Sequence, residues 1–250
     1  MIKRRGIIRA VWGNFNSIRE DVVNALRYEL PCHVFVFGDS NMRELYDLGM
    51  SASDTYCLHQ IDYGDAVWNL ETEFWRHKLE IFEVAGSYGF DEMLFLDWDC
   101  VPVKKFDVED MWRSLQQKEV FQANLYQYHT KRCLWRDEDW RKVCNGGFVY
   151  MRDTSIADEI IENWECFKKE IDEQREKRQS AGKDLRVREK YMIYDDEPAM
   201  SKWVDDYLDG WQGAEVYAEL FEPDICELNR NSAVPESFVK ARRPWFRHML

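Results

Sequence analysis

The sequence predicts an α/β fold with a mostly parallel central sheet, flanked by helices, and a less regular C-terminal half. Strand-like and helix-like segments alternate through the first hundred residues, and repeated β-α units build parallel sheets with helices on both faces. An apolar run, 93–96, then ends in two acidic residues, Asp97 and Asp99. Because ligands bind at the carboxyl ends of strands in such sheets, this junction predicts a functional site.

The first half contains four predicted strands and three predicted helices, each bounded by turn or capping residues. In order, we expect strand 6–12, helix 17–29, strand 32–37, a helix that ends at 48, strand 56–61, helix 70–88 and the strand that ends at 96. The first helix is predicted to open with a capping box, because Ser17 is followed three residues later by Glu20. Pro31 and Gly38 separate the next elements.

The second half has fewer regular signals. We expect strands at 121–128 and 147–151, and a long helix that begins near Asp153 or Thr154 and buries one face. Charges of both signs in 168–190 are typical of a solvated helix end followed by a loop. No repeat divides the chain, so we expect a single domain, 1–250, with 1–100 and 101–250 as its halves.

Composition excludes several classes of protein. The formal net charge of −13 argues against a general binder of duplex DNA or of anionic membranes. Seven cysteines without a Cys-x-x-Cys pair predict free thiols in a reducing compartment and argue against a zinc site. The sequence shows neither a signal peptide nor an apolar run long enough to span a bilayer. We therefore expect a soluble, cytoplasmic protein.

Asp97 and Asp99 are the first candidate site residues. Side chains at positions i and i+2 of an extended strand point to the same side, so the two carboxylates are predicted to face one point. Hard oxygen donors in that arrangement suit Mg²⁺ or Mn²⁺, and such an ion is a good partner for a diphosphate. The alternative is a polar strand end that caps the following turn.

Two glycines, Gly146 and Gly147, come just before the apolar residues of the strand predicted at 147–151 and form the second candidate segment. Paired glycines allow the backbone to approach a ligand closely, and their N–H groups can bind anionic or hydroxyl oxygens. A β-bulge or a tight turn is the alternative interpretation.

Acidic and basic segments near the C-terminus supply the remaining candidates. Asp195, Asp196 and Glu197 precede Pro198 at the start of a predicted helix, where acidic residues can also act only as caps and dipole partners. The basic tail 240–248 includes Arg243 and His248, which would suit closure over a diphosphate and metal ligation. The alternative is a frayed, merely basic terminus.

This ordered series of segments resembles the GT-A-fold glycosyltransferases, which use nucleotide-sugar donors. Asp97-Trp98-Asp99 after a strand looks like the family's Asp-x-Asp motif, which holds a divalent metal on the donor diphosphate. Lys78 lies on the preceding helix, which in the family sends a basic residue toward the donor, and Gly146-Gly147 resembles its Asn-x-Gly segment near the sugar. The resemblance implies a single GT-A-like (Rossmann-like) domain, with 1–100 binding the nucleotide and 101–250 binding sugar and acceptor.

The resemblance also assigns the remaining candidates. Asp196 and Glu197 correspond to the acidic pair that contacts sugar hydroxyls or serves as the base, and His248 corresponds to a histidine that completes the metal shell. The implied cofactor is Mn²⁺ or Mg²⁺, the favoured donor is a UDP-sugar, and the acceptor is a glycan, a protein or a small molecule. From topology we expect three further residues, at the ends of the first two strands, to contact the nucleoside: Trp12, Asn14 and Asp39.

Two other functions fit parts of the pattern. Asp97-Trp98-Asp99-Cys100-Val101 satisfies the nucleophile motif of haloacid-dehalogenase-like phosphatases, with Asp97 as the nucleophile. That motif normally opens its domain, whereas here about ninety residues of β-α structure come first. The other alternative is a non-catalytic protein that binds nucleotide sugars or glycans.

Overall fold

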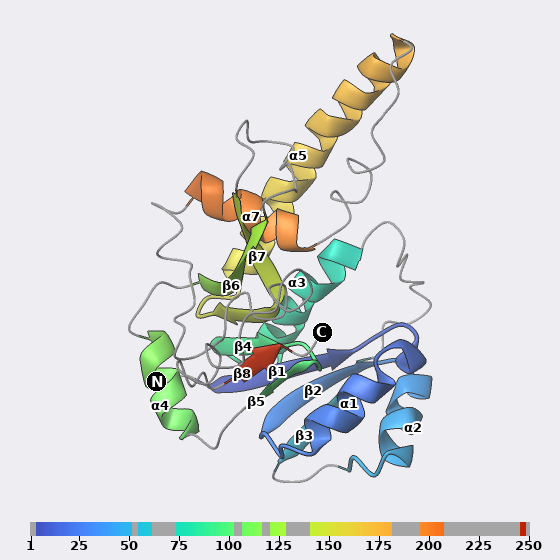
Figure 1. Cartoon of the computed structure of the whole chain (residues 1–250), viewed down its shortest axis with the longest axis vertical. Helices are drawn as coiled ribbons and strands as arrows, with labels where there is room; N and C mark the ends of the chain where they lie inside the picture. The colour runs from blue at the N-terminus through green and yellow to red at the C-terminus, as the bar shows by residue number, and fades with distance from the viewer. Residues whose placement is uncertain are drawn as a thin grey trace.

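The computed structural model describes residues 4–51, 55–61, 74–102, 107–116, 121–128, 141–181, 196–207 and 246–248 (Figure 1). The first part of the chain forms η1 (Phe15–Ser17) and the elements β1 (Arg5–Val11), α1 (Arg19–Leu26), β2 (Cys32–Phe37), α2 (Asp39–Asp47), β3 (Tyr56–Ile61), α3 (Phe74–Ser87), β4 (Glu92–Leu96) and β5 (Cys100–Pro102). The later elements are α4 (Val108–Gln116), β6 (Phe121–Tyr128), β7 (Arg141–Met151), α5 (Ser155–Ser180), α7 (Asp196–Tyr207) and β8 (Phe246–His248).

The described strands form a six-stranded sheet in the order β3-β2-β1-β4-β7-β6, and β5 pairs with β8 in a second, two-stranded sheet. Strands β3, β2, β1 and β4 are parallel, whereas β7 is antiparallel to both of its neighbours. Five of the six strands therefore run in one direction, which confirms the mostly parallel α/β fold. Because β6 and β7 join the same sheet as β1–β4, both halves of the chain contribute to one continuous layer.

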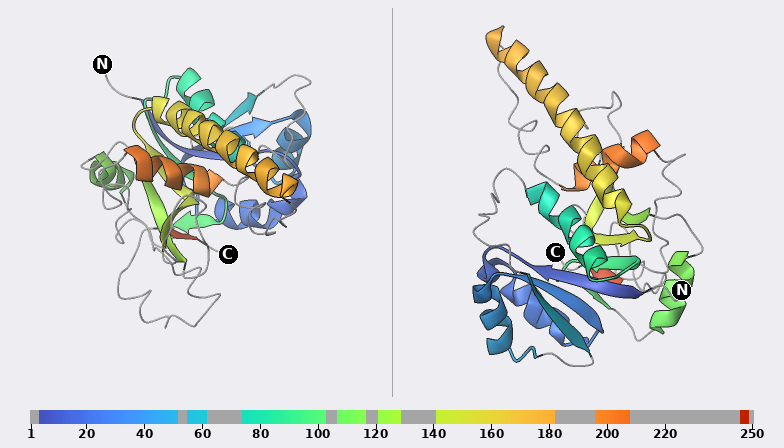
Figure 2. Two further views of the ribbon diagram at one scale, coloured as in Figure 1. Left: turned by 90° about the horizontal axis from the view of Figure 1, so that it is seen from above. Right: turned by 180° about the vertical axis from the view of Figure 1, so that it is seen from behind.

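Helices lie on both faces of the sheet (Figures 1 and 2), and alternating side chains give the sheet two apolar faces. Phe35 and Phe95 lie in a buried cluster with residues of α3, α5 and α7, and Val34 and Leu94 lie in another with residues of α1, α2 and α4. This division follows directly from the period of two along a strand. Helices on both faces bury β1 and β4 almost completely, whereas β3 stays partly exposed. The carboxyl ends of the parallel strands are the place where side chains from several elements meet.

Two local predictions were wrong. Ser17 does not cap a helix: its hydroxyl donates to the carbonyl oxygen of Asn14, η1 forms first, and α1 begins at Arg19 without a side-chain cap. The glycines do not precede β7 but lie inside it, because Arg141 already belongs to that strand. At Ser17 a competing local hydrogen bond replaced the predicted cap, and at the glycines pairing with β6 extended the strand beyond its local signal.

Helix α5 runs on to Ser180 through the charged segment predicted to be a helix end, and it extends well beyond the rest of the described chain (Figure 1). Its first turns pack on α3 and α7, where Trp164 is fully buried. Within the described residues, no helix combines the length and apolar character needed to cross a bilayer.

Candidate active site

A cavity of about 300 Å³ opens at the carboxyl ends of β1 and β4. It is lined by residues from β1, from the segment between β1 and α1, from α1, from α3 and from the turn after β4: Ala10, Trp12, Ser17, Ile18, Asp21, Lys78, Asp97, Trp98 and Asp99. Five predicted site residues therefore meet in one place, namely Trp12, Lys78, Asp97, Trp98 and Asp99.

The two aspartates converge through a turn and not through an extended strand, which corrects the predicted geometry. Strand β4 ends at Leu96, and the backbone N–H of Cys100 donates to the carbonyl oxygen of Asp97 at 3.0 Å, closing a four-residue turn. Asp97 and Asp99 stand at positions one and three of that turn. Both still line the cavity, and the Oδ1 atom of Asp99 is buried.

Arg9 in β1 holds this turn in place through hydrogen bonds to its backbone. Its guanidinium is buried and donates to the carbonyl oxygens of Asp97 at 2.6 Å and of Cys100 at 2.7 Å. It also lies over the Trp98 ring, and the indole N–H of Trp98 donates to the carbonyl oxygen of Ala10 at 2.8 Å. One buried cation thus satisfies two carbonyl groups at the start and end of the turn, which pre-organises the carboxylates between them.

Lys78 brings a positive charge from α3 to the same point. Its side chain is 8% exposed, and the ammonium group donates to Oδ2 of Asp97 at 3.0 Å and to the carbonyl oxygen of Gly146 at 3.2 Å. A buried ammonium group requires such partners because the loss of its hydration would otherwise be too costly. Lys78 therefore links α3, the aspartate turn and the glycine segment of β7.

Gly146 and Gly147 form a bulge in β7, as the alternative interpretation held. Ala123 of β6 pairs with Val149, but the next residue, Asn124, pairs with Asn145, so the residues between them have no partner in β6. The carbonyl oxygen of Gly147 accepts the N–H of Asp97 at 3.0 Å. The contacts described for these glycines are thus made by their carbonyl groups, which support the aspartate turn and Lys78.

The charge of the cavity lining bears on the ligand it can accept. Three carboxylates, those of Asp21, Asp97 and Asp99, face one ammonium group, that of Lys78. Such a cavity repels a diphosphate unless a cation lies between them. Carboxylate oxygens are the ligands that Mg²⁺ and Mn²⁺ prefer, so the donor set fits a hard divalent ion.

Two predicted nucleoside contacts are not among the residues that line this cavity. Asn14 caps η1, and its side-chain oxygen accepts the N–H of Asn16. Asp39 is exposed in the first turn of α2 and accepts a hydrogen bond from the Gln60 side chain. Both lie beyond the carboxyl ends of β1 and β2, as expected, but their described contacts are local ones.

The C-terminal candidates are described only in part. Asp196 and Glu197 begin α7, but their side chains lie outside the described part of the structure, as do Asp195 and Arg243 entirely. His248 has its backbone in β8, where it pairs with Cys100, the residue that follows Asp99. Paired antiparallel residues have Cα atoms about 5 Å apart. The terminal strand thus reaches the aspartate turn, although the orientation of the His248 side chain is outside the described residues.

Sequence reasoning missed two charged residues of this site, Arg9 beneath the turn and Asp21 in the cavity lining. Arg9 did carry a signal, because a charged residue in a buried strand requires a partner and therefore indicates a polar site nearby. Asp21 lies in the first turn of α1, where an acidic residue is ordinary, so nothing in the sequence distinguished it.

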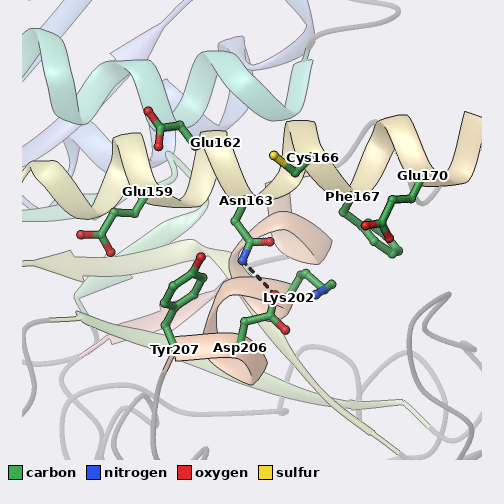
Figure 3. A pocket seen from close by; sticks show the side chains of 9 residues that line it. All are labelled: Glu159, Glu162, Asn163, Cys166, Phe167, Glu170, Lys202, Asp206 and Tyr207. Atoms are coloured by element: carbon green, nitrogen blue, oxygen red, sulfur yellow. Dashed lines mark hydrogen bonds and ion pairs between the residues drawn. The ribbon is translucent and has the colours of Figure 1, made fainter.

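A second hollow, of about 350 Å³, lies between α5 and α7 (Figure 3). It shares no residue with the aspartate cavity, and its polar groups contact one another: Asn163 donates to Asp206 at 2.9 Å, and Lys202 pairs with the same carboxylate. Phe167 and Tyr207 supply its aromatic surface. We interpret it as the groove between two packed helices.

Comparisons with known proteins extend this description. No protein-family model matches the sequence, and no curated protein matches it. Among the solved structures with a similar fold is the apo form of mouse xyloside xylosyltransferase 1, with a TM-score of 0.53 and 7% sequence identity. The match covers 98% of this chain and 97% of that one. The described part of the chain therefore has an α/β fold like that of this xylosyltransferase, while the identity is too low to carry residue roles across.

Proposed function

We propose that this protein is a metal-dependent glycosyltransferase that moves a sugar from a nucleotide-sugar donor, a UDP-sugar in preference, to an acceptor hydroxyl. The observation that carries the proposal is the cavity at the ends of β1 and β4, in which Asp97, Asp99 and Lys78 come together. The fold likeness to a xylosyltransferase supports the general class. The acceptor class is a glycan, a protein or a small molecule.

In this proposal Asp97 and Asp99 hold Mn²⁺ or Mg²⁺, and His248 is the third protein ligand. The pairing of His248 with Cys100 supports that role, because it brings the terminal strand beside the aspartate turn. The bound ion supplies the positive charge that stabilises the leaving nucleoside diphosphate. Without it the acidic lining would repel the same diphosphate.

The side chains of the cavity have distinct tasks. Lys78 holds Asp97 in place through its 3.0 Å contact and adds a positive charge on the donor side. Trp12 and Trp98 offer apolar and aromatic surface beside the carboxylates. Asn14 and Asp39 remain proposed nucleoside contacts at the neighbouring strand ends.

Groups from the second half complete the proposed reaction. Asp196 or Glu197 stabilises the positive charge that develops on the sugar carbon, or accepts the proton of the acceptor hydroxyl. Gly146 and Gly147 lie next to Lys78 and Asp97, where a backbone without side chains leaves room for the sugar. Arg243 would close over the diphosphate.

The phosphatase alternative is not favoured. Its nucleophile motif normally opens the catalytic domain, whereas here β1 to β3 and the helices that follow them precede Asp97. The fold of this chain is also similar to that of a glycosyltransferase. A non-catalytic nucleotide-sugar-binding protein has the same cavity, so turnover distinguishes it from the enzyme.

Thermal unfolding with nucleoside diphosphates tests the donor assignment. UDP with Mn²⁺ should raise the melting temperature more than either component alone, because a ligand that binds the folded state stabilises it. ADP and GDP with Mn²⁺ serve as matched controls. Release of UDP from a panel of UDP-sugars then tests turnover. The absence of any shift with every diphosphate would overturn the proposal, and phosphate release from a generic aryl phosphate would favour the phosphatase.

A further inference from the structure

Three metal-ligating side chains gather on β2 and β3, outside the aspartate cavity. His33 pairs with Cys57 in the parallel register, and His59 is two residues further along β3. Because paired residues and residues two apart share a face of the sheet, all three side chains point to the same side. One ligating atom from each lies within 4.8 Å of the others.

The two imidazoles are already in contact and held in place. Nδ1 of His33 lies 3.0 Å from Nε2 of His59. The His59 ring stacks on Phe35, with centroids 4.7 Å apart, and the His33 ring packs edge-on against Phe90 at 4.5 Å. Aromatic neighbours thus restrict both rings, so little conformational freedom remains to be lost when an ion binds.

The surroundings of both histidines favour the neutral imidazole, the state a metal ligand requires. Burial, with the charges of His59 and Arg4, lowers the pKa of His33 to about 4. Burial and Arg4 also lower the pKa of His59 below its usual value. Arg4 opposes a cation here, but a Cys57 thiolate would offset its charge.

The cluster is accessible from solvent. Cys57 is exposed, and both histidines are partly exposed. His33 and Cys57 are among the residues that line a cavity of about 230 Å³, together with Pro31 and Trp112. An ion can therefore reach the ligands without unfolding any strand.

We propose that His33, Cys57 and His59 form a surface zinc site with an open fourth position. Two nitrogen atoms and one sulfur atom are the donors that Zn²⁺ prefers, whereas Mg²⁺ and Ca²⁺ require oxygen. Tetrahedral zinc needs its ligating atoms about 3.3–3.7 Å apart, so the imidazoles must separate slightly and the thiol must approach. The spatial cluster revises the expectation, drawn from Cys spacing alone, that a zinc site is absent. It is independent of the proposed transferase activity.

Metal titration of tag-free protein tests the site. Co²⁺, a spectroscopic substitute for Zn²⁺, should give a thiolate-to-metal absorption band at one equivalent per chain, and Zn²⁺ should displace it. Cys57→Ser should abolish the band, and His59→Asn should weaken Zn²⁺ binding by about tenfold or more. Both variants should keep the wild-type melting temperature within a few degrees, because neither residue is fully buried.

Two matched variants control the experiment. Cys166→Ser removes another exposed cysteine, on α5, and should leave Co²⁺ and Zn²⁺ binding unchanged. Asp99→Asn, in the other site, should also leave the band unchanged. A band that persists in Cys57→Ser, or no Zn²⁺ binding by the wild type, would overturn the proposal and leave the histidine pair as a structural hydrogen bond.

Discussion

Cys57 and His59 are separated by one residue, as are Asp97 and Asp99, yet the two pairs converge by different means. Cys57 and His59 lie within β3, where alternation alone places them on one face. Asp97 and Asp99 lie in a turn after β4, held by the Arg9 guanidinium and by the carbonyl of Gly147. The first pair thus converges through local strand geometry, whereas the second pair converges through tertiary contacts.

The two sites also differ in ligand chemistry. The turn presents carboxylate oxygens and one ammonium group, which suit a hard ion and a diphosphate. The strand cluster presents imidazole nitrogen and a thiol, which suit a softer ion. In a site built on a turn, ligand binding can move the backbone. In a site built on paired strands, the backbone is held by the register and only the side chains can adjust.

The largest expected effect tests the turn site. Asp99→Asn should lower sugar transfer by about 10²-fold or more, because a neutral amide is a poor ligand for a hard ion that stabilises the leaving group. Initial rates with the preferred UDP-sugar and Mn²⁺ measure it. Asp47→Asn, an exposed residue at the end of α2, is the control and should keep full activity. Equal rates for the two variants would remove the aspartate turn from the chemistry.

A second prediction tests whether the turn depends on tertiary support. Arg9→Met leaves the buried carbonyls of Asp97 and Cys100 without their charged donor, at about 1–3 kcal/mol for each. The melting temperature should fall by roughly 4–24 °C, as measured by calorimetry. Arg19→Met, which removes a half-exposed ion pair with Glu44, should cost about 1 kcal/mol or less. A similar small loss for both variants would mean that the turn holds its shape without Arg9.

The smallest expected effect concerns the strand site and pH. The folded state lowers the pKa of His33 from 6.5 to about 4, so the unfolded chain binds the additional proton between these values. Stability should therefore be complete above pH 6.5 and decline as pH falls toward 4. In His33→Gln this decline should be shallower, and His59 should account for part of what remains. Melting temperatures from pH 4 to 7 measure it; parallel curves for the two proteins would contradict the assignment.

Much of the fold could be predicted because its signals are local. The strands Cys32–Phe37 and Tyr56–Ile61 have the predicted bounds, since β-branched and aromatic runs bounded by turn residues already determine them. The capping box at Ser17 failed because η1 uses that hydroxyl, and the glycine bulge could be recognised only against β6. Local patterns fix an element, while its exact start depends on its neighbours.

The candidate site could be predicted from the sequence to about the same extent as the fold. Asp97, Asp99 and Lys78 carried recognisable signals, and the structure brings them into one cavity. The roles of Asp196, Glu197, Arg243 and His248 stay predictions. Asp21 had no distinguishing signal, and the imidazole–thiol cluster was invisible because His33 is more than twenty residues from its partners in sequence.

The sequence by itself determined the alternation of strands and helices, the mostly parallel sheet and the position of the aspartates after a buried strand, since these follow from hydrophobic period and turn residues. Only the tertiary structure decided how the aspartates meet, through a turn that Arg9 and Gly147 support. It alone also placed His33 beside Cys57, through the register of β2 on β3. The physical reason is that hydrophobic periodicity is a property of a single segment of the chain. Hydrogen-bond partners and strand register depend on contacts between segments that are distant in sequence.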